Sequence, residues 1–173
     1  MKYFAYGSNM ALARLQERTP SARRLATCAL PGHALRFHKV GRDGSGKCDA
    51  YATGDPEDRV VGALFEICPG QKPALDAAEG LGAGYEQKVV LLKDGEGNRV
   101  EALTYYATAI DELLKPFCWY KNHVLIGARE SALPPAYIAR IERVETWRDP
   151  DPLREAGQLA IHGLSTAPLG DRF

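Results

Sequence analysis

The spacing of hydrophobic residues changes late in this 173-residue chain. Up to Ala107, short apolar stretches are separated by turns that contain glycine or proline, which is typical of strands. Beyond that point the apolar residues follow helical spacing, first at Phe117, Tyr120, Val124, Leu125 and Ala128 and then at Tyr137, Ile138, Ile141 and Val144. Two amphipathic helices, one ending near Ser131 and the other starting near Pro134, are therefore expected to cover a sheet.

Two hairpins are predicted among the strands. The stronger signal joins residues 85–92 to residues 99–107 through the glycine-rich turn Asp94-Gly95-Glu96-Gly97-Asn98. A second hairpin is expected between residues 24–30 and 34–40, on either side of Pro31-Gly32-His33.

Three other stretches of the first half are interpreted separately. Residues 59–68 are predicted to form a strand, because apolar side chains alternate from Val61 to Ile67. Residues 41–47 are polar and rich in glycine, but they neither follow a clear buried strand nor open a helix, as a phosphate-binding loop must. We expect a mobile loop there, and residues 49–54 remain ambiguous.

The first nine residues read as a short aromatic strand, a turn and the start of a helix. Gly7 allows backbone angles that a side chain would forbid, and Ser8 or Asn9 can cap a helix predicted over residues 10–18. The free N–H groups of such a turn suit a carboxylate or a developing oxyanion. The alternative is an ordinary strand-to-helix turn.

A candidate proton acceptor lies about seventy residues further on. Residues 71–79 are predicted to form a helix, since Pro73 suits its first turn and Gly80 suits a left-handed position after its end. Glu79 would then face the negative end of the helix dipole, which disfavours its charged form by about 0.3–1 kcal/mol. Such a carboxylate suits a base working near neutral pH. The alternative is a solvated glutamate without a role.

Composition argues against several other classes of protein. The chain has 22 basic and 22 acidic residues, so its net charge gives no reason to expect nucleic acid or a membrane surface as a partner. Its four cysteines and four histidines show no metal-binding spacing, and no metal site is predicted. Without a signal-peptide pattern or a long apolar run, a cytoplasmic protein with reduced cysteines is expected.

Nucleophilic catalysis is not favoured by the sequence. Ser8 lacks the G-x-S-x-G elbow of hydrolases, and Cys118 and His123 lie five positions apart on a predicted helix, so they face different directions. Trp119 and Trp147 are interpreted as packing residues.

Three blocks of residues carry a resemblance to a known family. They are Tyr3-Phe4-Ala5-Tyr6-Gly7-Ser8-Asn9-Met10, then Leu75-Asp76-Ala77-Ala78-Glu79-Gly80 with Gly84-Tyr85, and then Tyr120-Lys121 followed by Gly127-Ala128-Arg129-Glu130 and Leu133-Pro134. In this order they cover most of residues 2–138, and the chain resembles the gamma-glutamylcyclotransferase family. The resemblance implies an α+β fold, a small mixed β-barrel flanked by helices. Residues 1–147 would form one catalytic domain, with residues 148–173 as a tail that is weakly ordered or docked on it.

The resemblance also implies a reaction. Members of the family cyclise a small gamma-glutamyl substrate: its α-amine attacks its own δ-carbonyl and releases 5-oxoproline and an amine, with neither metal nor organic cofactor. Glu79 matches the catalytic glutamate, which takes a proton from the attacking amine and returns one to the leaving amine. The residues expected to line the pocket are Tyr6, Gly7, Ser8, Asn9, Tyr85 and Tyr120. For Tyr120, three positions after Phe117, a role in the core is the alternative.

Some questions stay open at the level of sequence. Asn9 after Gly7-Ser8 looks like the branch that takes gamma-glutamyl amino acids, but an amine, glutathione or a biosynthetic intermediate remains an alternative substrate type. A non-catalytic binding or interaction module on the same fold is the rival function. The resemblance is also compatible with a homodimer.

Overall fold

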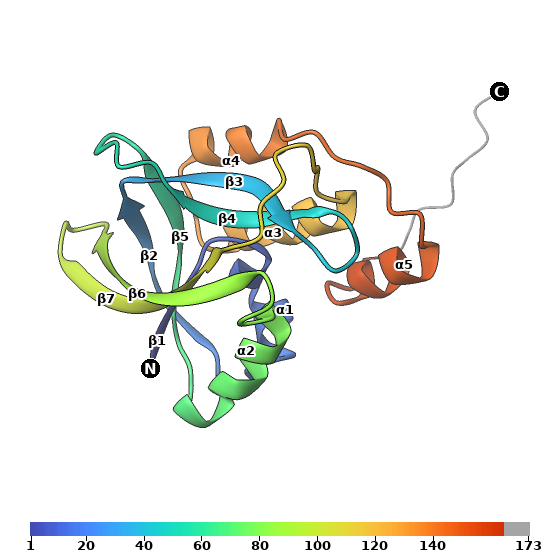
Figure 1. The fold of residues 1–173 in the computed structure, drawn as a ribbon. Coiled ribbons are helices and arrows are strands. Elements are labelled where there is room, and N and C mark those ends of the chain that lie inside the picture. Colours follow the sequence, from blue (N-terminus) through green and yellow to red (C-terminus); the bar gives the residue numbers. More distant parts are fainter. Residues whose placement is uncertain (165–173) are drawn as a thin grey trace.

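The computed structural model describes residues 1–164, and a closed barrel of five strands lies at its centre (Figure 1). Around the barrel the strands follow the order β1 (Lys2–Ala5), β5 (Arg59–Glu66), β2 (Arg23–Pro31), β6 (Tyr85–Asp94) and β7 (Arg99–Ala107). Neighbouring strands are antiparallel except β1 and β7, which run parallel and pair through Tyr3 and Leu103. The expected mixed β-barrel is therefore confirmed.

The predicted hairpin between β6 and β7 is also confirmed. The two strands pair from Tyr85 opposite Ala107 to Lys93 opposite Arg99. The turn between them is held by the Asp94 carboxylate, which accepts hydrogen bonds from backbone N–H groups of the turn. Local turn chemistry is sufficient to specify this pairing.

The predicted hairpin between the second and third strands is wrong. β2 already has β5 on one edge and β6 on the other, so neither of its edges is free for β3 (His33–Val40). The chain turns away at Gly32, where φ is +71°, and β3 pairs instead with β4 (Gly46–Ala52) in a separate two-stranded sheet. The ambiguous residues 49–54 thus belong largely to a strand, and the expected loop at 41–47 includes the turn of this hairpin and the start of β4.

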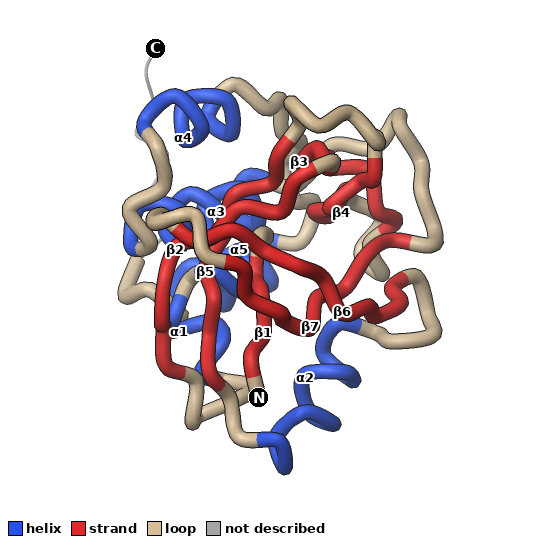
Figure 2. The backbone as a smooth tube through the Cα atoms, turned by 90° about the vertical axis from the view of Figure 1, so that its left-hand side faces the viewer, coloured by secondary structure: helices blue, strands red, loops and turns tan. Residues whose placement is uncertain are grey.

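Helices surround the barrel and are arranged on different sides of it (Figures 1 and 2). In Figure 2, α2 lies at the opposite end of the view from α4. Their bounds are η1 (Ser8–Met10) and η2 (Pro69–Gln71), both 3₁₀ turns, and α1 (Leu12–Gln16), α2 (Lys72–Glu79), α3 (Cys118–Glu130), α4 (Pro135–Glu142) and α5 (Pro152–Ala160). The two helices predicted for the last third of the chain, α3 and α4, are confirmed.

The helix expected over residues 10–18 is shorter and begins differently. η1 comes first, and Gly7 and Ala11 precede η1 and α1 at their N-terminal ends without any side-chain cap. The expectation that Ser8 or Asn9 caps a helix is therefore wrong. Both side chains lie in the 3₁₀ turn itself, which leaves Asn9 available for other contacts.

The turn after β1 is held in place by α3. A Cβ atom on Gly127 would lie 2.3 Å from the backbone nitrogen of Ala11, so only glycine lets α3 approach η1 this closely. Three residues later, the Glu130 carboxylate accepts a hydrogen bond from the backbone N–H of Leu12, at 3.0 Å, in the first turn of α1. The Gly127-to-Glu130 block therefore has a structural task, which is to position the turn.

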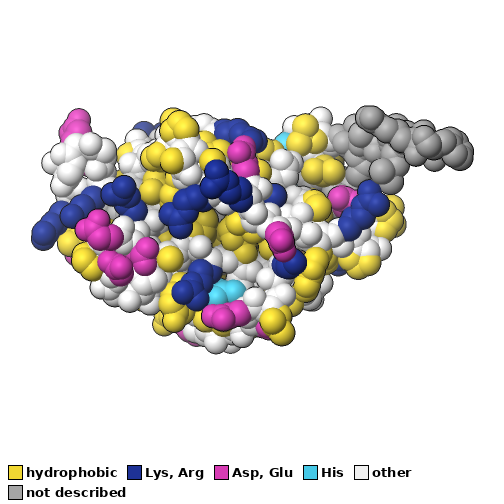
Figure 3. All heavy atoms as spheres, turned by 90° about the horizontal axis from the view of Figure 1, so that it is seen from above, with side chains coloured by type: hydrophobic (Ala, Val, Ile, Leu, Met, Phe, Trp, Pro, Cys, Tyr) yellow, Lys and Arg dark blue, Asp and Glu magenta, His cyan; other side chains and the backbone are white. Residues whose placement is uncertain are grey.

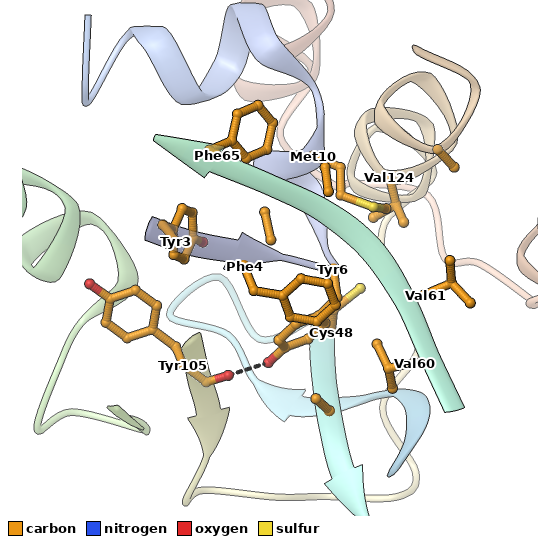
Figure 4. Packing of buried hydrophobic residues seen from close by; sticks show 14 of the residues in the cluster. Tyr3, Phe4, Tyr6, Met10, Cys48, Val60, Val61, Phe65, Tyr105 and Val124 are labelled. Carbon is orange, nitrogen blue, oxygen red and sulfur yellow. Dashed lines mark hydrogen bonds between the residues drawn. The ribbon is translucent and has the colours of Figure 1, made fainter. Parts of the chain in front are cut away.

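Large hydrophobic side chains anchor the turn to the core (Figure 4). Phe4 and Phe65 are completely buried on the paired strands β1 and β5. Met10 of η1 and Val124 of α3 lie side by side and are also without exposed surface. Each such side chain contributes about 1.5–3 kcal/mol on burial, so the turn is fixed on both sides.

The C-terminal segment forms a helix, α5, that contacts the rest of the protein. Gln158 accepts a hydrogen bond from Arg14, and His162 lies 2.6 Å from His123 between ring nitrogens. Leu159 packs against the core, whereas Leu153 is 84% exposed. Helix α5 thus lies within the expected tail and contacts the domain, and residues 165–173 of that tail lie outside the described residues. No helix in residues 1–164 has the length and apolar character needed to cross a membrane.

Candidate active site

A small pocket opens where the turn after β1 meets the end of α2. We call it the inner pocket, and its lining comes from the barrel, η1, β4, α2 and α3: Tyr3, Tyr6, Gly7, Ser8, Asn9, Cys48, Glu79, Tyr85, Tyr105 and Tyr120. All seven residues expected at the site from sequence are in this set. The structure thus brings together segments that are more than one hundred residues apart in the chain.

The turn presents free backbone donors to this pocket. Within residues 1–164, none of the hydrogen bonds uses the backbone N–H of Gly7, Ser8 or Asn9 as its donor. A Cβ atom on Gly7 would lie 2.9 Å from Cβ of Cys48 and 3.4 Å from the Tyr120 hydroxyl. Gly7 is therefore required by close packing across the pocket. The neighbouring N–H groups can donate hydrogen bonds to an anion or an oxyanion.

Asn9 connects the turn to Glu79. Its Nδ2 atom donates to Oε1 of Glu79 at 2.5 Å and to the Tyr3 hydroxyl at 3.2 Å. Its Oδ1 atom accepts a hydrogen bond from Arg18, which fixes the orientation of the amide. Because both ends of the Asn9 side chain are bonded, the carboxylate of Glu79 is held facing the turn.

The environment of Glu79 favours its neutral form. The residue ends α2, and Gly80 follows it in the left-handed conformation with φ of +73°, as predicted. Burial raises the pKa of the Glu79 carboxyl, while Arg18, the hydrogen bond from Asn9, Arg14 and Lys39 act in the opposite direction. The expected direction is correct, and burial is its main cause. A carboxylate tuned in this way suits proton transfer near neutrality.

Tyr85 and Tyr120 hold the backbone of Cys48 between them. The Tyr85 hydroxyl donates to the Cys48 carbonyl oxygen, and the Tyr120 hydroxyl accepts from the Cys48 N–H at 3.0 Å. Tyr85 has thereby used its only proton, whereas Tyr120 keeps one to donate. Tyr120 is a buried residue of α3 and also lines the pocket.

Three lining residues were missed from sequence, and the side chain of Tyr6, which was expected in the pocket, also makes a structural contact. The Tyr6 hydroxyl donates to the Tyr105 carbonyl oxygen at 2.6 Å, so the side chain of Tyr6 braces β1 against β7 (Figure 4). The missed residues are Tyr3, Cys48 and Tyr105. Alternation along the first strand could have indicated Tyr3, but the other two lie on β4 and β7, whose positions beside the turn depend on tertiary packing.

A larger cavity of about 280 Å³ continues outward from the inner pocket. We call it the outer chamber; it shares Ser8, Glu79, Tyr85 and Tyr120 with the inner pocket. Its other lining residues are Arg14, Arg18, Lys39, Gly41, Arg42, Asp43, Lys47, Ala78, Trp119, Arg154 and Gln158. The glycine-rich stretch at 41–47 and helix α5 therefore both border the site.

Metal binding and nucleophilic catalysis find no support in this site. Within the described part of the chain, no group of three His, Cys, Asp or Glu side chains is placed to hold a metal ion. Cys118 is exposed whereas His123 is completely buried, so the two do not form a pair. The groups of this site that suit proton transfer and anion binding are the Glu79 carboxylate and the free N–H groups of the turn.

The chain is similar to several known proteins. Residues 59–141 match the profile of the AIG2-like family. Gamma-glutamylcyclotransferases from Bos taurus and Homo sapiens are each 30% identical over 147 residues, covering 83% of this chain and 78% of the relative. A solved gamma-glutamyl cyclotransferase structure superposes with a TM-score of 0.79 at 26% identity, covering 85% of this chain and 89% of that one. The chain is thus an enzyme of this type and belongs to the gamma-glutamylcyclotransferase family.

Proposed function

We propose that this protein converts a gamma-glutamyl amino acid into 5-oxoproline and the free amino acid, with Glu79 as general base and general acid. The observation that carries the proposal is the 2.5 Å hydrogen bond from Asn9 to Glu79 across the inner pocket. It holds a carboxylate of raised pKa opposite a turn whose N–H groups are free. Base and oxyanion donors then face the same small cavity.

The proposed reaction begins with the α-ammonium group of the substrate. Glu79 removes a proton from it, and the neutral amine attacks the δ-carbonyl carbon of the same gamma-glutamyl group. The carbonyl oxygen takes up the electron pair and becomes an oxyanion. Donors on the turn at Gly7 to Asn9, and the free proton of Tyr120, are placed to bind this oxyanion or the substrate α-carboxylate.

The second half of the proposed reaction breaks the original amide bond. The oxyanion collapses, the C–N bond to the amino acid breaks, and Glu79 returns its proton to the leaving nitrogen. The second proton of the ring nitrogen passes to the departing amine, which leaves as an ammonium group beside a neutral lactam nitrogen. Attack within one molecule needs no nucleophilic side chain, and well-oriented intramolecular reactions reach effective molarities of about 10⁵ M or more. The pocket therefore has to fold the substrate and stabilise charge.

Incubation of the purified protein with gamma-glutamyl amino acids, gamma-glutamylamines and glutathione tests the proposal, with 5-oxoproline measured by mass spectrometry. We expect release from the gamma-glutamyl amino acids, at a rate lowered by about 10³-fold in a folded Glu79→Gln variant. Release from amines or glutathione alone would refute the proposed leaving group. Binding of these compounds without any release would favour the rival, a non-catalytic binding module.

A further inference from the structure

The outer chamber carries an excess of positive charge that the protein itself does not neutralise. Six of its lining side chains are cationic and two, Asp43 and Glu79, are acidic. Lys47 is paired with Asp43 at 2.7 Å, and Arg154 is paired with Asp149. The other four cations form no ion pair with any carboxylate of residues 1–164, and they are Arg14, Arg18, Lys39 and Arg42.

The excess is local to the chamber. The whole chain has equal numbers of basic and acidic residues. On the face shown in Figure 3, side chains of both charges are interspersed with hydrophobic ones. The chamber therefore gathers more basic than acidic side chains although the chain as a whole is neutral, and a general affinity for polyanions does not explain it.

Two of the unpaired cations are buried. Lys39 is 5% exposed, and its Nζ atom lies 4.5 Å from the centre of the Tyr85 ring. Arg14 is 8% exposed, and its guanidinium group is hydrogen-bonded to the neutral side chains of Gln158 and His123. Its Nε atom is buried without a hydrogen-bond partner in the described chain. Burying a charge without a counter-charge is unfavourable. An anionic ligand in the chamber would remove this cost.

The four cations form two pairs from different parts of the fold. Arg14 and Arg18 come from α1 and the turn after it; burial, followed by repulsion from Arg18, lowers the pKa of Arg14 to about 10. Lys39 and Arg42 come from the hairpin of β3 and β4; burial lowers the pKa of Lys39, the Glu79 carboxylate raises it, and Arg42 acts in the same direction as burial. Each pair gathers like charges, so one anionic group between its members would relieve their repulsion.

The position of the chamber determines which part of a substrate reaches it. In the proposed reaction the gamma-glutamyl group occupies the inner pocket, where the free N–H groups of the turn can bind its α-carboxylate. The leaving group must then extend past Glu79 into the outer chamber. A simple amino acid brings one carboxylate to a chamber that offers two pairs of cations.

We propose that the leaving group is an amino acid with a second carboxylate, so that gamma-glutamyl-glutamate or gamma-glutamyl-aspartate is the preferred class of substrate. One carboxylate lies between Arg14 and Arg18 and the other between Lys39 and Arg42. This inference rests on the proposed function and adds the chemistry of the leaving group to it. Arg42, at the exposed edge of the chamber, is a specificity-determining residue that does not touch the reacting atoms.

The test compares substrates that differ in one charge but hardly in shape. The values of kcat/KM are measured by 5-oxoproline release for gamma-glutamyl-glutamate against gamma-glutamyl-glutamine, and for gamma-glutamyl-aspartate against gamma-glutamyl-asparagine, with gamma-glutamyl-alanine as reference. We expect the acidic member of each pair to be favoured by about 10- to 100-fold, the range for a hydrogen bond to a charged group. The preference should shrink as salt is added.

Variants test whether the cations of the outer chamber cause the preference for acidic leaving groups. Arg42→Gln and Lys39→Gln are each expected to lower the ratio of the two kcat/KM values toward one. Arg99→Gln is the matched control. Arg99 is exposed near the turn of the β6–β7 hairpin, and Tyr85, which lines the chamber, lies at the opposite end of that hairpin. Thermal unfolding shows that each variant is folded.

The outcomes separate this inference from the proposed function. Release of 5-oxoproline from the neutral substrates at the same kcat/KM as from the acidic ones would overturn the inference and leave the function standing. A preference that survives both Arg42→Gln and Lys39→Gln would overturn the assignment to the chamber. Absence of release from every substrate would overturn both.

Discussion

The inner pocket and the outer chamber share four residues but differ in how many of their polar side chains have partners within the protein. In the inner pocket, the hydroxyls of Tyr6, Tyr85 and Tyr120 bond to protein backbone, and Asn9 is bonded at both ends of its amide. In the outer chamber, four cations have no carboxylate partner among the described residues. The inner pocket is therefore held in shape by the protein alone, whereas the outer chamber is completed by a ligand.

This difference fits the two tasks that a cyclising enzyme has to perform. Ring closure needs a base and oxyanion donors at fixed positions, and preorganised donors cost no rearrangement during reaction. Recognition of the leaving group needs favourable contacts in the bound state, which unpaired charges supply. Changes in the inner pocket should therefore affect turnover, and changes in the outer chamber should affect the choice of substrate.

The largest effect is expected when the base is removed. Glu79→Gln should lower kcat by about 10³-fold, within the range for general acid–base catalysis, because glutamine keeps the shape but cannot take a proton. The dissociation constant of the substrate, measured by calorimetry with the inactive variant, should change little. Glu86→Gln, an exposed glutamate next to Tyr85, is the control. A comparable loss of kcat in the control would contradict the assignment.

A smaller loss of activity is expected when a side chain is introduced at Gly7, in the turn after β1. Gly7→Ala places a Cβ atom 2.9 Å from Cβ of Cys48, so the turn must shift relative to β4. A displacement of about 1 Å in a preorganised site costs roughly 10²-fold in rate. The measurement is kcat/KM for 5-oxoproline release, with Gly95→Ala as control because its Cβ would meet nothing within 4 Å. Wild-type activity in Gly7→Ala would show that the turn is not held tightly.

The next effect concerns the hydrogen bonds from Tyr85 and Tyr120 to the backbone of Cys48, which hold the inner pocket together. Tyr120→Phe leaves the buried N–H of Cys48 without its 3.0 Å acceptor, which should reduce the free energy of unfolding by about 1–3 kcal/mol. Urea denaturation measures this change. Tyr51→Phe is the matched control, since Tyr51 is 36% exposed and lies near the C-terminal end of β4. Equal losses in the two variants would argue against a preorganised inner pocket.

The smallest effect is a gain of stability when Glu79, the proposed base, is replaced. Burial raises the folded-state pKa of Glu79 above the ordinary value of 4.5, so the carboxyl destabilises the folded state increasingly as pH rises above 4.5 through the raised pKa. Glu79→Gln should therefore stabilise the protein at pH 7 by about 0.5–2 kcal/mol, the usual range for a stabilising substitution.

The pH dependence of that gain is its check. Below pH 4.5 the carboxyl is protonated in both the folded and the unfolded state, so the advantage of Glu79→Gln should disappear there. Urea denaturation at pH 4 and pH 7 measures the difference. A gain of the same size at both pH values would mean that ionisation of Glu79 is not its cause.

Local features of the fold followed from the sequence, and the barrel followed from resemblance to a family. The β6–β7 turn, the end of α2 at Gly80 and the helical spacing of α3 and α4 each depend on residues that are near neighbours in the chain. The pairing of β2 could not be predicted in this way. Both of its edges are occupied by strands from distant parts of the chain, which forced β3 to pair with β4.

By itself, the sequence determined the two segments that the proposed mechanism uses: a turn with Gly7, and Glu79 at the end of a helix. Those depend on backbone freedom and helix ends, which are local properties. Only the tertiary structure decided that Asn9 orients Glu79, that Cys48 lies between two tyrosines, and that Lys39 and Arg42 meet Arg14 and Arg18 in one chamber. The physical reason is that these contacts join β-strands and helices whose packing depends on closure of the whole barrel.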